Sequence, residues 1–218
     1  TLVATLAPGA TQTLTLTVPV TATGATDSAS ITASSVPDSN LGNNTDTSVS
    51  SALFADVTSS VDLPVSAAAG SVVTVTATFA NSATGATATT ATSATGTVVL
   101  SDGTTQTFAL GDLAPGASAT RSFTATVPSS TATTLLSATS TVATSTPESN
   151  TANNVGTDTL VVLFADPAVD VGVIPSGVPG ATVTTTLSLT NNGSATTSIT
   201  VTVSINGSLT TVVATLAP

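Results

Sequence analysis

Apolar and polar residues alternate with a period of two in several stretches of the chain. Residues 14–18 alternate leucine or valine with threonine. The same kind of alternation occurs in residues 73–79, 123–127, 199–203 and, interrupted at Thr185, 183–189. A period of two predicts strands with one buried face. No segment sustains a helical period, so we expect almost no helix.

Turn signals separate these stretches at short intervals. Asp102-Gly103 and Asn206-Gly207 favour hairpin turns, because Asp-Gly and Asn-Gly tolerate positive φ. Pro8-Gly9 and Pro115-Gly116 mark a second kind of turn. About seven short strands in a unit of roughly 110 residues predict an all-β, immunoglobulin-like sandwich, and a barrel is the less favoured alternative.

Several landmarks recur along the chain. Leu53-Phe54-Ala55-Asp56 returns 110 positions later as residues 163–166, and Pro37-Asp38-Ser39-Asn40 returns at the same offset as Pro147-Glu148-Ser149-Asn150. Leu-Ala-Pro-Gly-Ala occurs at residues 6–10 and again at 113–117. Recurrence at a fixed spacing is typical of tandem repeats, and the small change in offset indicates loops of different length.

The landmarks divide the chain into three parts. Residues 53–162 form one complete unit, residues 1–52 the back half of a unit, and residues 163–218 the front half. A half sandwich exposes its core face and an unpaired strand edge. We therefore expect each half to be completed by a complementary half, from the next copy or from the continuing chain.

Two arrangements would complete the halves. Either the sequence is a window on a longer tandem chain, or separate copies join head to tail. Residues 211–218 nearly duplicate residues 1–8, and two copies of one strand would compete for one place in a head-to-tail polymer. The duplication therefore favours the longer chain, and both arrangements give a filament.

Composition limits what the core and the surface can do. Apolar residues make up 40% of the chain, but they are mostly Ala, Val and Leu, which suit strands better than long helices. Disordered chains are usually poorer in β-branched residues, so a folded protein is the better interpretation. Arg121 is the single basic residue against eleven acidic ones. Binding to nucleic acid needs several basic side chains, so we expect no nucleic-acid partner. No apolar run is long enough for a membrane span.

The residues needed for catalysis are largely missing. A serine or threonine nucleophile needs an adjacent base, and the chain contains no His and no Lys. A pair of carboxylates could act on glycosides, but such enzymes also need a substrate cleft. The absence of Cys rules out disulfides and thiolate metal sites. We expect no enzymatic activity and no bound cofactor.

Calcium is the one cofactor with some support in the sequence. The two recurring turns offer oxygen ligands, of the kind that calcium prefers, from Asp38, Asn40, Glu148 and Asn150. Their spacing matches no calcium loop, and Asx side chains that cap their own turn explain the same pattern. The capping role is the stronger interpretation.

Two further sets of residues stand out. Asn43, Asn192 and Asn206 fit the acceptor pattern for N-glycosylation, although Asn-Gly is also explained by the turn. Phe54 and Phe164 begin equivalent stretches, and we expect them to be buried anchors where successive sandwiches meet.

The order of these motifs resembles known surface proteins. The motifs follow one another in the order Ala-Asp start, Val/Thr strand that ends in Asn, Leu-Ala-Pro-Gly-Ala turn and Pro-Asp/Glu-Ser-Asn turn. This order is similar to that in the immunoglobulin-like tandem repeats of bacterial and archaeal cell-surface proteins. These include the conserved surface-repeat domain of unknown function and the cell-adhesion-related domain of bacteria. The resemblance implies an extracellular filament, or the stalk of an adhesin whose ligand-binding tip lies elsewhere.

Overall fold

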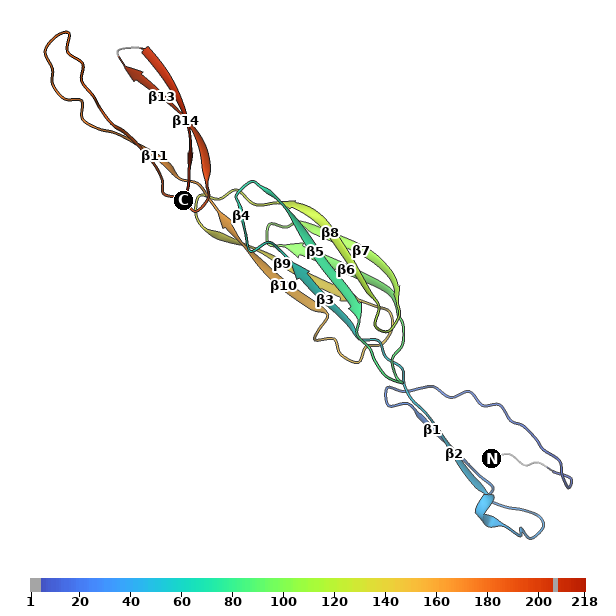
Figure 1. The fold of residues 1–218 in the computed structure, drawn as a ribbon. Coiled ribbons are helices and arrows are strands. Elements are labelled where there is room, and N and C mark those ends of the chain that lie inside the picture. The colour runs from blue at the N-terminus through green and yellow to red at the C-terminus, as the bar shows by residue number, and fades with distance from the viewer. Residues whose placement is uncertain (1–4, 206–207) are drawn as a thin grey trace.

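A computed structural model describes residues 5–205 and 208–218 (Figure 1). The central part is a sandwich of two sheets. One sheet has the order β3 (Val57–Asp62), β5 (Val72–Asn81), β8 (Ser118–Thr126). The other has the order β4 (Ser66–Ala68), β10 (Val155–Leu163), β9 (Thr134–Ala143), β6 (Ala91–Leu100), β7 (Thr105–Leu113). All pairs are antiparallel except the short parallel pair of β4 with β10.

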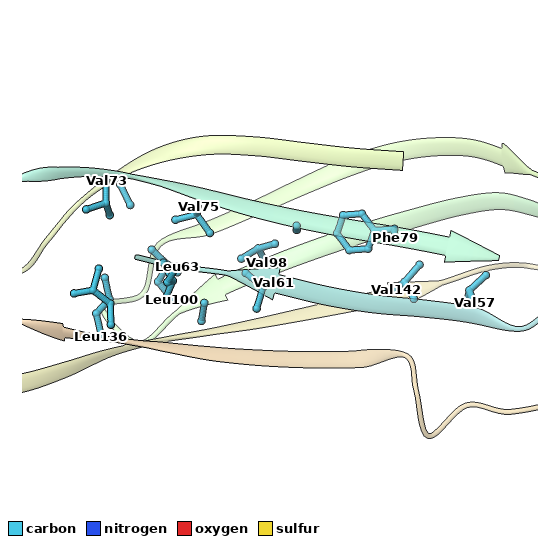
Figure 2. Packing of buried hydrophobic residues seen from close by; sticks show 14 of the residues in the cluster. Val57, Val61, Leu63, Val73, Val75, Phe79, Val98, Leu100, Leu136 and Val142 are labelled. Carbon is cyan, nitrogen blue, oxygen red and sulfur yellow. The ribbon is translucent and has the colours of Figure 1, made fainter. Parts of the chain in front are cut away.

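Alternating residues from the two sheets fill the core. Along β5, Val73, Val75, Ala77 and Phe79 are buried while the residues between them face outward. Figure 2 shows Val73, Val75 and Phe79 between the two sheets with Val98, Leu100 and Leu136 of the opposite sheet. Phe79 is the largest fully buried side chain. The core is thus built from small aliphatic residues around a single fully buried aromatic ring.

Two segments extend from opposite ends of the sandwich (Figure 1). The N-terminal segment contains β1 (Ala25–Ser30), a 3-10 turn η1 (Leu41–Asn43) and β2 (Thr45–Ser50). The C-terminal segment contains β11 (Pro167–Val171), β12 (Leu187–Asn191), β13 (Thr197–Ile205) and β14 (Ser208–Leu216). Their strands form only two-stranded sheets, β1-β2, β11-β12 and β13-β14.

The predicted fold class is confirmed: the described residues are nearly all-β, with η1 as the one short helix. The two sheets are separate, which makes the central part a sandwich and not a barrel. The strands expected at residues 123–127, 73–79 and 199–203 are present as β8, β5 and β13. The turns are also present, with Gly9 at φ 78° and Gly103 at φ 94°. Asn206 and Gly207 lie outside the described residues.

The strand prediction at residues 14–18 is wrong, and the one at residues 183–189 is wrong in part. Residues 11–18 alternate like a strand but form none, and Val183 lies before the start of β12. The reason is physical: a strand needs a hydrogen-bonding neighbour, and in the described chain these stretches have none.

Candidate assembly surfaces

The C-terminal segment repeats the pairing of the sandwich with the same register. In the sandwich, Val57 of β3 lies opposite Asn81 of β5. In the C-terminal segment, Pro167 of β11 lies opposite Asn191 of β12, and both positions are shifted by 110 residues. Register is set by the buried face and by the turn. The same local sequence therefore builds the same strand pair in both places.

An asparagine marks the same corner in both pairs, fully buried in the sandwich (Asn81) and half-buried in the C-terminal segment (Asn191). Asn81 Oδ1 accepts a hydrogen bond from the Asp56 amide at 3.1 Å, and Asn191 Oδ1 accepts one from the Asp166 amide at 3.0 Å. Asn81 also donates through Nδ2 to the carbonyl oxygens of Thr89 and Leu113, each at 2.9 Å. Each asparagine satisfies backbone groups that have no place in the strand ladder.

The N-terminal segment reproduces the other edge of the sandwich. The β1–β2 pair places Ala29 opposite Asp46, just as β9–β10 places Ser140 opposite Gly156. The amide of Ile31 donates to the Asn44 carbonyl at 2.7 Å, as that of Val142 donates to the Asn154 carbonyl at 3.0 Å. Ile31 thus takes the place of Val142.

The turn that precedes β8 in the sandwich also recurs in the N-terminal segment. Gly9 and Gly116 both have φ 78°. The amide of Ala10 donates to the Ala7 carbonyl at 2.9 Å, and that of Ala117 donates to the Ala114 carbonyl at 2.9 Å. The turn therefore forms from local sequence alone, with or without a partner strand.

Equivalent apolar side chains are buried in the sandwich and exposed in the flanking segments. Val61 and Val142 expose 9% and 5% of their surface, whereas their equivalents Val171 and Ile31 expose 61% and 60%. Leu63 is 5% exposed and its equivalent Val173 is 92% exposed. Further exposed apolar residues of the flanking segments are Leu14, Leu16, Val18, Val20, Val49, Val169 and Val183. Large exposed apolar side chains that gather in one segment are typical of an interaction site.

The two flanking segments are not perfect copies of the sandwich. A Cβ atom at Gly156 would lie 2.6 Å from the Ser59 carbonyl oxygen, and the equivalent residue of β2 is Asp46. Strand β2 is the equivalent of β10, and β11 is the equivalent of β3. Because of the Asp46 side chain, β2 cannot approach β11 of another unit as closely as β10 approaches β3. At the position of Ser140, which hydrogen-bonds Ser59 at 2.7 Å, the N-terminal segment has Ala29, and the C-terminal segment has Val169 in place of Ser59.

The calcium candidates of the N-terminal turn act as hydrogen-bond acceptors of that turn. Asp38 Oδ1 accepts from the Asn40 amide at 2.9 Å, and Asn40 Oδ1 accepts from the Gly42 amide at 3.1 Å. Hydrogen bonds from the Asn40 amide and then from the Asn44 side chain lower the pKa of the fully exposed Asp38 carboxyl. These bonds fit an Asx turn.

The candidates of the second turn are tied to the sandwich. Glu148 accepts from the Val57 amide through Oε2 at 3.2 Å and from Asn154 Nδ2 through Oε1 at 3.1 Å. Asn150 Oδ1 accepts from the Ala152 amide at 3.0 Å. In the described part of the chain, no three His, Cys, Asp or Glu side chains come together as metal ligands.

Sequence reasoning did not find how the second turn is joined to β3. Asn153 Nδ2 donates to Asp56 Oδ1 at 2.8 Å, and the Oδ1 atoms of Asn153 and Asn154 are buried without a hydrogen-bond partner among the described residues. Asp158 Oδ2 accepts from the Leu63 amide at 2.7 Å. These contacts join residues 91 or more positions apart, and no local pattern in the sequence reveals them.

The remaining candidates that the structure describes lie at the surface or near it. Asn43 and Asn192 are exposed, and Asn206 lies outside the described residues. Phe54 and Phe164 are half-buried and neither belongs to the core cluster. Phe54 bonds through its backbone to Thr87 and Thr89, and the Phe164 amide donates to Ser194 Oγ at 3.1 Å.

The sandwich is similar to domains of known proteins. Residues 53–158 match the CARDB family model. CARDB is a cell-adhesion-related family of non-catalytic, immunoglobulin-like domains. The matched stretch begins just before β3 and ends at residue 158, within β10, the last strand of the sandwich.

Two solved structures of the CARDB domain of one Pyrococcus furiosus protein are similar to this chain. The solution NMR structure has 18% identity and a TM-score of 0.43, and it covers 50% of this chain and 96% of that domain. The crystal structure, in complex with di-metal ions, has 18% identity and a TM-score of 0.42, and it covers 51% of this chain and 91% of that domain. No curated protein matches the chain. Among the described residues, no helix has the length and apolar character that crossing a membrane requires.

Proposed function

We propose that this protein is a structural component of an extracellular filament or stalk, built from β-sandwich units joined head to tail. The observation that carries the proposal is the pair of incomplete strand sets on either side of a complete sandwich. The β11–β12 and β1–β2 pairs repeat the registers of β3–β5 and β9–β10, and both segments expose apolar side chains whose equivalents the sandwich buries.

The two sets are complementary in content. The C-terminal segment supplies strands equivalent to β3, β5, β6 and β7, and the N-terminal segment supplies equivalents of β9 and β10 together with the turn before β8. Joining the C-terminal segment of one unit to the N-terminal segment of the next would place one apolar face against the other. Burial of about 25 cal/mol per Å² of apolar surface favours that association.

A structural role also fits the chemistry of the surface. The chain offers no His, Lys or Cys for catalysis, and the family matched by residues 53–158 is non-catalytic. The partner is either a second copy or the adjacent repeat of a longer chain. The family's link with cell adhesion supports a location at the cell surface, and it also favours a second candidate, the repeat stalk of an adhesin.

Electron microscopy and analytical ultracentrifugation of the chain test the proposal. We expect filaments with an axial repeat of one or two sandwich units. Leu16 is 84% exposed, so Leu16→Asp leaves a single copy folded but would place a charge in the joined core. Loss of filaments with Leu16→Asp but not with the neighbouring Thr15→Asp supports the proposal. A chain that stays monomeric at all concentrations contradicts assembly from separate copies.

A further inference from the structure

Among the exposed surfaces, the free edge of β12 is the one for which the sandwich shows what kind of strand would cover it. Strand β12 is hydrogen-bonded to β11, and among the described residues no strand pairs with its other edge. In the sandwich the corresponding edge of β5 is occupied by β8, over nine residue pairs from Val72↔Thr126 to Ala80↔Ser118. The edge of β12 therefore has the hydrogen-bonding groups of β5 but not the strand that covers them.

Residues 9–18 have the properties of the missing strand. They follow the same Leu-Ala-Pro-Gly-Ala turn that precedes β8, with the same φ of 78° at its glycine. Leu14, Leu16 and Val18 lie on alternate positions, as Phe123 and Ala125 do in β8, and all three are exposed. Threonines occupy the positions between them, and this is the pattern of a strand with one buried face.

We propose that residues 9–18 of one copy add to the free edge of β12 of a second copy as the third strand of the β11-β12 sheet. This inference rests on the head-to-tail assembly proposed above and names its contact. Strand addition of this kind obtains affinity from main-chain hydrogen bonds and specificity from alternate side chains. Strand β14 already pairs with β13, in the place that β7 takes beside β6, so the added segment begins at the turn.

The turn determines the register of the added strand. In the sandwich, the Gly116 amide donates to the Asn81 carbonyl at 2.7 Å, and the Asn81 amide donates to the Ala117 carbonyl at 2.9 Å. The same contacts at Asn191 would engage Gly9 and Ala10. Leu14 then lies opposite Leu187, on the apolar face.

The segment is shorter than β8, and this difference in length defines a second register. Between the turn and the Thr-Val-Pro triplet, the N-terminal segment has two residues fewer than the sandwich. Alignment on the triplet instead of the turn shifts the strand by two residues. Ser188, the equivalent of Thr78, then faces Thr11 instead of Thr13. In the sandwich, the hydroxyls of Thr78 and Thr120 lie 3.3 Å apart on the outer face.

Disulfide trapping between copies distinguishes the registers. The chain contains no cysteine, so a full-length chain with Ser188→Cys can be mixed with one carrying Thr13→Cys, and in a parallel sample with one carrying Thr11→Cys. Strand pairs on one face lie within disulfide range. After joint refolding and mild oxidation, we expect the Thr13→Cys sample to give a covalent dimer at least about ten times more abundant than the Thr11→Cys sample, a difference of about 1.4 kcal/mol.

The outcomes separate this inference from the proposed function. A dominant Thr11→Cys dimer overturns the register. Filaments in the electron microscope without any dimer above the level of single-cysteine controls overturn strand addition and leave the proposed function standing. Neither filaments nor dimer overturns both strand addition and assembly from separate copies. Circular dichroism of each variant, unchanged from the parent chain, shows that these exposed substitutions leave the fold intact.

Discussion

The ring of Phe79 lies directly against the backbone of Gly96, on the neighbouring sheet of the sandwich. A Cβ atom at position 96 would be 2.5 Å from Cζ of Phe79. Phe79 is fully buried and is the one aromatic ring at the centre of a core of Val, Leu and Ala. The glycine provides the space for this ring, because any side chain at position 96 would need the same volume.

Gly96→Ala is expected to destabilise the sandwich by about 1–3 kcal/mol, because the added methyl group overpacks the core. Urea denaturation measures the effect. Gly96→Ala combined with Phe79→Leu should cost less than the sum of the two single changes, since the smaller side chain leaves room for the methyl group. The exposed Thr124→Ala serves as the control and should change stability by less than about 0.5 kcal/mol. Additive costs in the double variant would show that the contact is not tight.

Glu148→Gln should destabilise the sandwich by about 1.5–3 kcal/mol. The carboxylate accepts hydrogen bonds from the Val57 amide and from Asn154 Nδ2, and an amide group would turn one of these acceptors into a donor facing a donor. Chemical denaturation at neutral pH is the measurement. Asp62→Asn, on an exposed position of β3, is a matched loss of one charge and should be neutral. Equal effects of the two changes would indicate a general charge effect.

Arg121 is the sole site for trypsin, because the chain has no other basic residue. It lies within β8 opposite Ala77, and its Nη1 donates to the Thr120 carbonyl at 3.0 Å. Cleavage requires β8 to leave the sheet, so the native chain should resist trypsin and be cut once, into two fragments, only when urea opens the sandwich. Mass spectrometry of a time course follows the cut. Rapid cleavage without urea would show that β8 is not stably paired.

Removal of calcium should leave the melting temperature unchanged. The oxygens of Asp38, Asn40, Glu148 and Asn150 already accept hydrogen bonds from the chain itself, which fits capping of the two turns. Differential scanning calorimetry with a chelator and with added calcium provides the test. A calcium-dependent rise that disappears in Glu148→Gln would instead place a calcium site at the second turn.

The turn at Asp38 should loosen in acid. Hydrogen bonds from Asn40 and Asn44 hold the folded pKa of Asp38 below its ordinary value of 3.8, so the folded turn binds a proton less tightly than the unfolded chain does. Its contribution is therefore complete above the ordinary pKa and is lost as pH falls through that value toward the lower folded pKa. NMR shifts of the Asn40 amide report the change. In Asp38→Asn the amide shift should no longer titrate in this range, and persistence of the titration would assign it to another group.

The alternating pattern and the turn residues by themselves determined strands β5, β8 and β13 and the positive φ of Gly9, Gly103 and Gly116, and the motif that recurs at an offset of 110 accompanies the equal registers of β3–β5 and β11–β12. These features depend on neighbours along the chain or across a single hairpin, so a local sequence carries them wherever it occurs. Residues 11–18 carry the same strand pattern but form no strand, because half of a strand's hydrogen bonds belong to its partner. Only the tertiary structure decided that Phe79 needs a glycine at position 96. It alone also decided that Glu148 accepts a hydrogen bond from the backbone of β3 and that Asp158 accepts one from the backbone of Leu63, which follows β3. The physical reason is that these contacts join segments that only packing brings together.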